Sequence, residues 1–212
     1  MPIEITGIPA LKDNYIWVMT DALRHHAVII DPGVAKPVHD FLATNNLTLS
    51  AILVTHHHWD HTDGIAELVT AYHCPVYGPH IQSPHLSIPA LGIELNVIAI
   101  PGHTLDHVAF YSPDILFCGD TLFSAGCGRI REGTPEQMYT SLKKLTALPD
   151  HTRIYCGHEY TLNNLRFAEI VEPSNLKIKE KIKKVLKLRE HNLPTLPTTL
   201  QDEKEINPFL RA

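Results

Sequence analysis

The sequence predicts an α/β protein in which two strand-rich halves are covered by helices, a four-layer α/β arrangement. Apolar runs typical of strands come first, then a helix, then strands again and further helices. Hydrophobic residues make up 44% of the 212 residues and charged residues 19%, which leaves enough apolar material for a sizeable core. In this arrangement the loops at the strand ends meet at one edge, where sites are commonly built.

The N-terminal half alternates between strand and helix patterns. Strands are predicted at residues 3–11, 14–20, 26–33, 49–55 and 74–79. The run at 49–55 is apolar on both faces, so it is expected to be a central strand. Helices are predicted at residues 35–46 and 63–73, and residues 79–91 are expected to be a loop.

The C-terminal half repeats the alternation and then changes in composition. Strands are predicted at residues 93–104, 107–113, 115–121 and within 152–161, and helices at 134–148, 162–171 and 174–192. Thr134 is the expected N-cap of the first of these helices, with Pro135 at its first position. The last helix is rich in lysine, and residues 193–212 are expected to be a Pro/Thr linker with a short end, so a boundary is placed near Pro173.

The net charge and the N-terminus exclude several classes of protein. A formal net charge of −5 argues against a nucleic-acid-binding protein, which is usually basic. No basic segment followed by a long apolar run begins the chain, and no apolar run reaches the length of a membrane span. The four cysteines are scattered, as expected for reduced thiols. We therefore expect a cytoplasmic protein that binds neither nucleic acid nor membranes. A monomer is the expected oligomeric state.

The segment "THHHWDH", residues 55–61, follows the central strand and carries potential metal ligands. His56 and His58 are two residues apart, so they point the same way in an extended segment, whereas His57 points the opposite way and is not expected to be a ligand. Asp60 and His61 follow at the entry to the next helix, and Trp59 is expected to pack. A solvated polar loop is the alternative, but the spacing at a strand-to-helix junction favours a metal site.

Three further strands end at a glycine followed at once by a potential ligand. The three residues are His103, Asp120 and His158. Each alone could be an ordinary loop residue, but together they complete two sets of ligands. The first set is His56, His58 and His103, the second is Asp60, His61 and His158, and Asp120 is left to bridge two ions. Nitrogen and oxygen ligands suit zinc, iron or manganese, and such a centre can generate a hydroxide nucleophile.

These motifs resemble a known family. "THHHWDH" matches the T-H-x-H-x-D-H signature of the metallo-β-lactamase superfamily, and "CGDTLFSAGCGR", "CGHEYT" and "NPFLR" make the chain similar to the glyoxalase II (hydroxyacylglutathione hydrolase) family. The resemblance implies an αββα sandwich with two divalent metal ions, zinc first and iron or manganese as alternatives. It implies the same division of the ligands into two sites, with Asp120 in both.

The activity implied by the resemblance is hydrolysis of S-D-lactoylglutathione to D-lactate and glutathione, the second step of methylglyoxal detoxification. A metal-bridging hydroxide, oriented by Asp60 and Asp120, would attack the thioester carbonyl. Residues 1–172 would form the catalytic domain and residues 173–212 a C-terminal helical glutathione-binding region. Relatives usually continue past "NPFLR", so this region is expected to be shorter than in the family.

Four residues are candidates for binding glutathione. Arg129 matches a basic position that the family uses, and Arg131 stands where relatives often have an aromatic side chain; an arginine fork suits a carboxylate. Tyr160 resembles a tyrosine that contacts glutathione, with packing on the next helix as the alternative. Arg211 matches an arginine of the C-terminal region.

Other functions are compatible with parts of the pattern. A lactonase, a β-lactamase or a nuclease could share the fold, a persulfide dioxygenase would use a single iron, and a non-catalytic module would bind metal without turnover. The complete second set of ligands argues against the single-iron enzyme. The lysines of residues 177–187 are expected to be solvated, while an apolar face docks on the protein: Leu176, Ile178, Ile182, Val185, Leu186 and Leu188.

Overall fold

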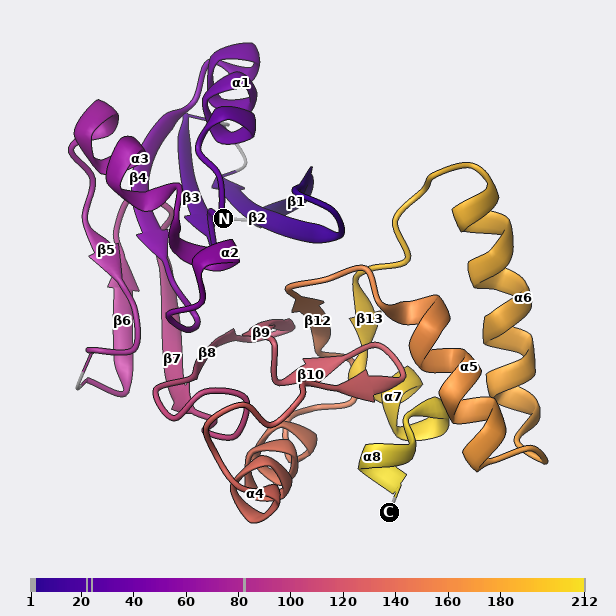
Figure 1. Ribbon diagram of the computed structural model, residues 1–212. Coiled ribbons are helices and arrows are strands. Elements are labelled where there is room, and N and C mark those ends of the chain that lie inside the picture. Colours follow the sequence, from indigo (N-terminus) through magenta and orange to yellow (C-terminus); the bar gives the residue numbers. More distant parts are fainter. Residues whose placement is uncertain (1–2, 22, 24, 82, 212) are drawn as a thin grey trace. The chain divides into compact units, whose positions relative to one another are not determined.

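A computed structural model describes residues 3–21, 23, 25–81 and 83–211 (Figure 1). The chain forms two compact units. The first comprises Met1–Ala99 and Asp106–Ser112, and the second comprises Ile100–Leu105 and Pro113–Ala212.

The first unit contains a five-stranded sheet in the order β1-β2-β3-β4-β5. Its strands are β1 (Ile3–Ala10), β2 (Asn14–Asp21), β3 (His26–Ile30), β4 (Thr48–Leu53) and β5 (Val76–Tyr77). Strands β1 to β3 are antiparallel, whereas β3, β4 and β5 run parallel. Ile30 pairs with Leu53 in β4, so the carboxyl ends of β3 and β4 lie side by side. The unit also contains an antiparallel array of β6 (His85–Ile88), β7 (Ile93–Ala99) and β8 (Val108–Ser112).

Helices α1 (Lys36–Asn45) and α3 (Ile65–Tyr72) pack on the five-stranded sheet, and α2 (Trp59–Thr62) is a single turn after β4 (Figure 1). Val38 and Leu42 of α1 and Leu68 of α3 are buried with apolar residues of β2, β3 and β4 in one cluster. The run predicted to be a central strand is β4, and its last three residues, Ala51–Leu53, are fully buried. The core therefore holds the end of β4, from which the histidine segment continues.

The second unit pairs β9 (Ile115–Gly119) with β12 (Arg153–Cys156) in parallel, and β12 with β13 (Thr198–Thr199) in antiparallel orientation. A separate two-stranded hairpin joins β10 (Leu122–Phe123) to β11 (Gly126–Cys127). The helices are α4 (Pro135–Thr146), α5 (Thr161–Val171), α6 (Leu176–Glu190), α7 (Leu200–Ile206) and α8 (Pro208–Arg211). The predicted N-cap of α4 is confirmed. The Thr134 hydroxyl accepts from the Gln137 amide, the Gln137 side chain accepts from the Thr134 amide, and Pro135 is the first residue of the helix.

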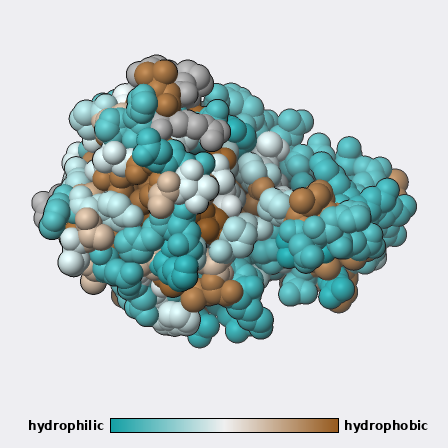
Figure 2. All heavy atoms as spheres, turned by 90° about the horizontal axis from the view of Figure 1, so that it is seen from above, coloured by the Kyte–Doolittle hydropathy of each residue, from teal (hydrophilic) through white to brown (hydrophobic). Residues whose placement is uncertain are grey.

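Helices α5 and α6 lie side by side and share a small apolar core (Figure 1). Ile178 and Val185 of α6 are buried in it and Ile182 is partly buried. The docked face is narrower than predicted, because Leu176 and Leu186 are exposed. The surface around α6, at the right of Figure 2, is mainly hydrophilic, as expected for the solvated lysines.

Three local predictions were wrong. Most of the segment predicted as a linker is structured, because Thr198–Thr199 form β13 and Leu200–Ile206 and Pro208–Arg211 form α7 and α8. The missed signal is a Thr-x-x-Asp N-cap, in which the Thr199 hydroxyl accepts from the amide of Asp202 at 3.1 Å. The expected loop at 79–91 contains β6, whose backbone is paired by β7. Trp59, which was expected to pack, is not buried but 63% exposed.

The thiols are reduced, as the scattered cysteines predicted. All four cysteines are free thiols, and burial raises the pKa of Cys127 to about 11, so this thiol is protonated at neutral pH. Among the described residues, no helix combines the length and apolar character needed to cross a membrane.

The apolar core that α5 and α6 share should contribute measurably to stability. Replacing Ile178 by alanine should lower the free energy of unfolding by about 2–4 kcal/mol, because it leaves a cavity. Leu176→Ala, in the same helix but exposed, should change it by no more than about 0.5 kcal/mol. Urea unfolding followed by circular dichroism measures both, and equal effects of the two changes would contradict this packing.

Candidate metal centre

The first group of potential ligands follows β4 directly, within the first unit. His56 and His61 are buried, and His58 and Asp60 are partly buried at the start of α2. His57 points elsewhere, as predicted: its side chain is 52% exposed, and its Nδ1 lies 3.0 Å from the Asp106 carboxylate. The alternation in this segment therefore separates His57 from its neighbours.

The carboxylate of Asp31 organises this group. Asp31 follows β3, in the left-handed region with φ +54°, which aspartate tolerates better than most residues. It accepts hydrogen bonds from the amide and hydroxyl of Thr55, both at 2.7 Å, and from His61 Nδ1 at 3.1 Å. One buried carboxylate thereby connects the ends of β3 and β4 with α2.

These hydrogen bonds decide which histidine nitrogens are available as ligands. A carboxylate only accepts, so His61 carries its proton on Nδ1 and can ligate through Nε2. Since the Thr55 hydroxyl gives its proton to Asp31, its oxygen accepts from His56 Nδ1 at 3.0 Å. His56 therefore also presents Nε2 as its potential ligand atom.

The presented nitrogen atoms have a spacing that suits a metal ion. His56 Nε2 lies 3.1 Å from His58 Nδ1. Two nitrogen ligands of one tetrahedral zinc, each about 2.0–2.1 Å from the ion, lie roughly 3.3 Å apart. The residues of the first unit therefore fit a divalent metal, and Asp31, His56 and His61 form a further buried cluster of potential donors.

Asp60, on helix α2, is held by a residue of strand β2. The Asn14 side-chain amide, at the start of β2, donates to the Asp60 carboxylate at 3.1 Å and to its carbonyl at 3.3 Å. Asn14 is itself buried. The sequence pattern did not reveal this role or those of Asp31 and Thr55. The only signals were the short motifs "KDNYIW" and "IDPG", in which Asn14 and Asp31 stand.

The second group of potential ligands, His103, Asp120 and His158, lies in the second unit. The Asp120 carboxylate is 3.2 Å from His158 Nε2 and 3.6 Å from His103 Nε2. Parallel pairing of β9 with β12 brings Asp120 and His158 together, because each follows the carboxyl end of its strand. The glycines before His103 and Asp120 have positive φ, +151° at Gly102 and +47° at Gly119, whereas Gly157 before His158 is not among the glycines with positive φ.

His103 is oriented by the backbone of a neighbouring loop. Its Nδ1 donates to the carbonyl oxygen of Arg129 at 2.7 Å, which leaves Nε2 facing the Asp120 carboxylate. All three residues of this group are buried. The second unit therefore also presents donors that could hold a metal.

The predicted substrate residues lie in different surroundings. The side chains of Arg129 and Arg131 are exposed, after the hairpin that follows Asp120. The Tyr160 ring stacks on the ring of His158, with centroids 4.7 Å apart and planes 4° from parallel, and it meets Phe123 edge-on. Tyr160 therefore contacts a predicted ligand directly.

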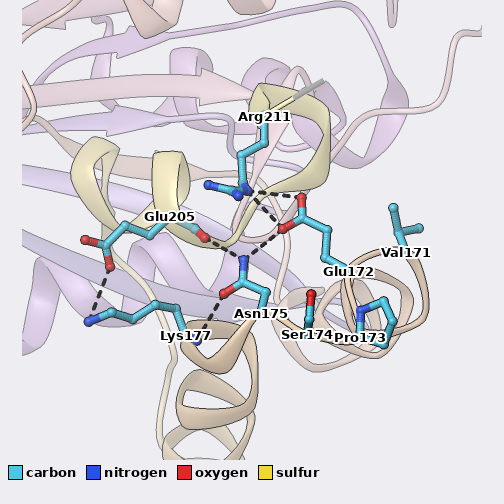
Figure 3. A pocket seen from close by; sticks show the side chains of 8 residues that line it. All are labelled: Val171, Glu172, Pro173, Ser174, Asn175, Lys177, Glu205 and Arg211. Carbon is cyan, nitrogen blue, oxygen red and sulfur yellow. Dashed lines mark hydrogen bonds and ion pairs between the residues drawn. The ribbon is translucent and has the colours of Figure 1, made fainter.

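Arg211 lies on α8 beside a pocket of about 530 Å³ (Figure 3). Its Nε donates to both carboxylate oxygens of Glu172 at 3.0 Å, and its Nη1 donates to the carbonyl of Lys204 at 3.2 Å. The Asn175 amide donates to the same carboxylate of Glu172 at 2.8 Å. Arg211 is thus part of a network of the C-terminal helices, and its predicted contact with glutathione stays a prediction.

Comparison with known proteins agrees with the fold. The family described as "Metallo-beta-lactamase superfamily" matches residues 14–92 and 81–158, and "Hydroxyacylglutathione hydrolase C-terminus" matches residues 159–212. The crystal structure of BLEG-1 B3 metallo-β-lactamase is similar in fold, with a TM-score of 0.74, 22% identity, and coverage of 99% of this chain and 100% of that chain. That of TTHA1623 in a di-iron-bound form has a TM-score of 0.68 and 25% identity, and covers 98% of this chain and 100% of that chain.

The family match and the fold therefore define an α/β protein of the metallo-β-lactamase class, which confirms the predicted fold class. A relative from Edwardsiella ictaluri, named hydroxyacylglutathione hydrolase, is 48% identical over 220 residues, which cover 99% of this chain and 87% of the relative. The chain belongs to the hydroxyacylglutathione hydrolase family.

The hydrogen bonds of Asp31 make a prediction about metal binding. Asp31→Asn keeps the shape of the side chain and tolerates the positive φ. If its oxygen accepts from the Thr55 amide, its nitrogen cannot accept from the Thr55 hydroxyl and His61. The affinity for zinc should fall about 10–100-fold, as measured by competition with a chelator. Asp63→Asn, at an exposed position of the same segment, is the control and should leave the affinity unchanged. Equal affinities of the Asp31 variant and the original chain would contradict the orienting role.

Proposed function

We propose that this chain hydrolyses hydroxyacylglutathione thioesters, S-D-lactoylglutathione among them, releasing the hydroxy acid and glutathione. The reaction would be the second step of methylglyoxal detoxification. The observation that carries the proposal is the 48% identity, over 99% of this chain, to a protein named hydroxyacylglutathione hydrolase. The predicted monomeric state and cytoplasmic location stay predictions.

The proposed metal centre combines the two groups of donors. His56, His58 and His103 would hold one ion, Asp60, His61 and His158 would hold the other, and Asp120 would bridge them. Support comes from the hydrogen bonds that fix the nitrogens of His56, His61 and His103. Zinc is the proposed metal, with iron or manganese as alternatives; the related TTHA1623 was crystallised in a di-iron-bound form.

Bound divalent ions would supply Lewis acidity and lower the pKa of water toward neutrality. Asp60 and Asp120 would orient the attacking hydroxide toward the thioester carbonyl, and the Asn14 amide would keep the Asp60 carboxylate in place. The leaving group is a thiolate, and because a thiol has a pKa of about 8.5, no strong general acid is required. The role of the chain is therefore mainly to position charge and the nucleophile.

Glutathione recognition is assigned to the predicted substrate residues. Arg129, Arg131 and Arg211 would attract its carboxylates, and Tyr160, stacked on His158, would contact its backbone. Residues 173–212 are proposed as the glutathione-binding region, in line with the family match at 159–212. Arg129, Arg131 and Arg211 all have exposed side chains, and of these three Arg211 is already paired with the Glu172 carboxylate.

The bridging role of Asp120 can be tested directly. Asp120→Ala should lower kcat for S-D-lactoylglutathione by more than about 100-fold and reduce the content of bound metal, because it removes a ligand of both ions. Removing the metal from the original chain with a chelator should also abolish activity, and adding zinc should restore it. The control is Asp114→Asn, a carboxylate that is 57% exposed and paired with His151. Full activity of Asp120→Ala, or of the metal-free protein, would refute the proposed centre.

The exposed arginine after the hairpin gives a second test. Arg129→Ala should raise KM for S-D-lactoylglutathione about tenfold and change kcat less than about twofold, because it removes an ionic contact made equally in the ground and transition states. The backbone carbonyl that accepts from His103 stays in place. Arg166→Ala, an exposed arginine of α5, is the matched control. An unchanged KM would exclude Arg129 from glutathione binding.

A further inference from the structure

A buried polar pair, Glu203 and Asn207, connects α7 with the β10–β11 hairpin. The Glu203 carboxylate, with no exposed surface, accepts from the Ala125 amide and the Thr198 hydroxyl, both at 2.7 Å. The Asn207 side-chain amide, also fully buried, donates to the carbonyls of Phe123 at 3.1 Å and Gly126 at 2.9 Å. It also donates to Glu203 at 3.1 Å, so the two side chains act as one unit.

The pair holds a strained turn. Ser124 and Ala125 form the two-residue connection between β10 and β11, and Ala125 has φ +58°, in the left-handed region that favours glycine. The backbone groups that Glu203 and Asn207 bind are those of the turn and its two flanking residues. Such a conformation persists only where the surroundings fix it. The pair therefore decides the shape of this hairpin.

The hairpin in turn carries the groups that orient two predicted ligands. Asp120 stands two residues before it, and Gly128 directly after it bonds back to Thr121 at 3.0 Å. A methyl group on Gly128 would lie 1.8 Å from the Asp120 carbonyl, so the backbone on the two sides of the hairpin leaves no space for a side chain there. The next residue, Arg129, supplies the carbonyl that accepts from His103 Nδ1 at 2.7 Å.

Retaining a carboxyl group at this depth has a cost. Burial raises the pKa of Glu203, since the charged form loses its hydration, and the hydrogen bonds from Ala125, Thr198 and Asn207 act in the opposite direction. An apolar side chain of similar size would avoid this cost but could not bind the Ala125 amide. A buried acceptor is therefore needed at position 203 to bind the Ala125 amide of the turn.

We infer that Glu203 and Asn207 are positioning residues for His103 and Asp120. By fixing the β10–β11 turn, they hold the Gly128–Arg129 segment, and this segment sets the ring orientation of His103 and the backbone of Asp120. The inference rests on the proposed metal centre, and it joins the C-terminal helix α7 to the ligands of the second unit.

The test measures metal binding in the full chain. Glu203→Gln keeps the size of the side chain but turns an amide group toward donors, so it should loosen the turn. The dissociation constant for zinc, obtained by chelator competition, should rise about tenfold, and the visible spectrum of the cobalt-substituted protein should shift. Asn207→Ala, which keeps the carboxylate and removes the two carbonyl contacts, should act in the same direction and serves if Glu203→Gln does not fold.

A matched control separates positioning from general stability. Asn175→Ala removes hydrogen bonds to Glu172 and to the Glu205 carbonyl within the same helical part, but it does not touch the hairpin. It should lower the free energy of unfolding without changing zinc affinity or the cobalt spectrum. If Asn175→Ala weakens zinc binding as much as Glu203→Gln, or if the Glu203 and Asn207 variants bind zinc unchanged, the inference is wrong.

A rescue tests the route through the turn. Ala125→Gly, added to Glu203→Gln, should recover part of the zinc affinity, because glycine adopts φ +58° without strain, although it leaves the turn more flexible than alanine does. No recovery would mean that Glu203 acts by another route and would overturn the inference. Failure of the original chain to bind zinc, iron or manganese would instead refute the proposed metal centre, so the two failures are distinguishable.

Discussion

The hydrogen bonds of the Asp31 carboxylate fix the orientation of His56 and His61 in the first group of ligands. It accepts from Thr55 and His61 and, through the Thr55 hydroxyl, fixes the proton of His56. Parallel pairing of β3 with β4 places Asp31 beside Thr55, since Ile30 pairs with Leu53 and the Asp31 amide bonds to the Leu53 carbonyl at 3.0 Å. A feature of sheet register thus decides which nitrogen each histidine presents.

In the second unit a backbone carbonyl, not a carboxylate, orients a histidine ring. The carbonyl of Arg129 replaces a carboxylate as the acceptor for His103 Nδ1. A carbonyl can orient an imidazole only as well as its own loop is fixed, and this loop follows a hairpin of two short strands. The hairpin has only two paired positions, too few to be rigid by itself. The buried side chains of Glu203 and Asn207 hold it in place, so helix α7 affects the orientation of His103.

The sequence predicted those parts of the site that local pattern encodes. The spacing of His56 and His58, the capped start of α4 and the glycines before His103 and Asp120 all depend on near neighbours, and the structure has them as expected. Asn14 and Asn207 could not be recognised, because their partners lie far along the chain, 46 residues away for Asp60 and 81 for Gly126. Helix α7 was missed because a seven-residue helix after a Pro/Thr segment has little periodicity, and burial of Leu200 and Ile206 stabilises it.

The choice of alanine at position 125 follows from the same requirement for rigidity. A left-handed residue other than glycine costs about 1–2 kcal/mol, and an intramolecular hydrogen bond contributes about 0.5–1.5 kcal/mol, so the Glu203 contact can offset much of the strain. Glycine would remove the strain but also widen the range of conformations open to the turn. Alanine held by a buried carboxylate leaves the turn one accessible shape. The Arg129 carbonyl, four residues further on, is then held in one position, where it accepts from His103 Nδ1.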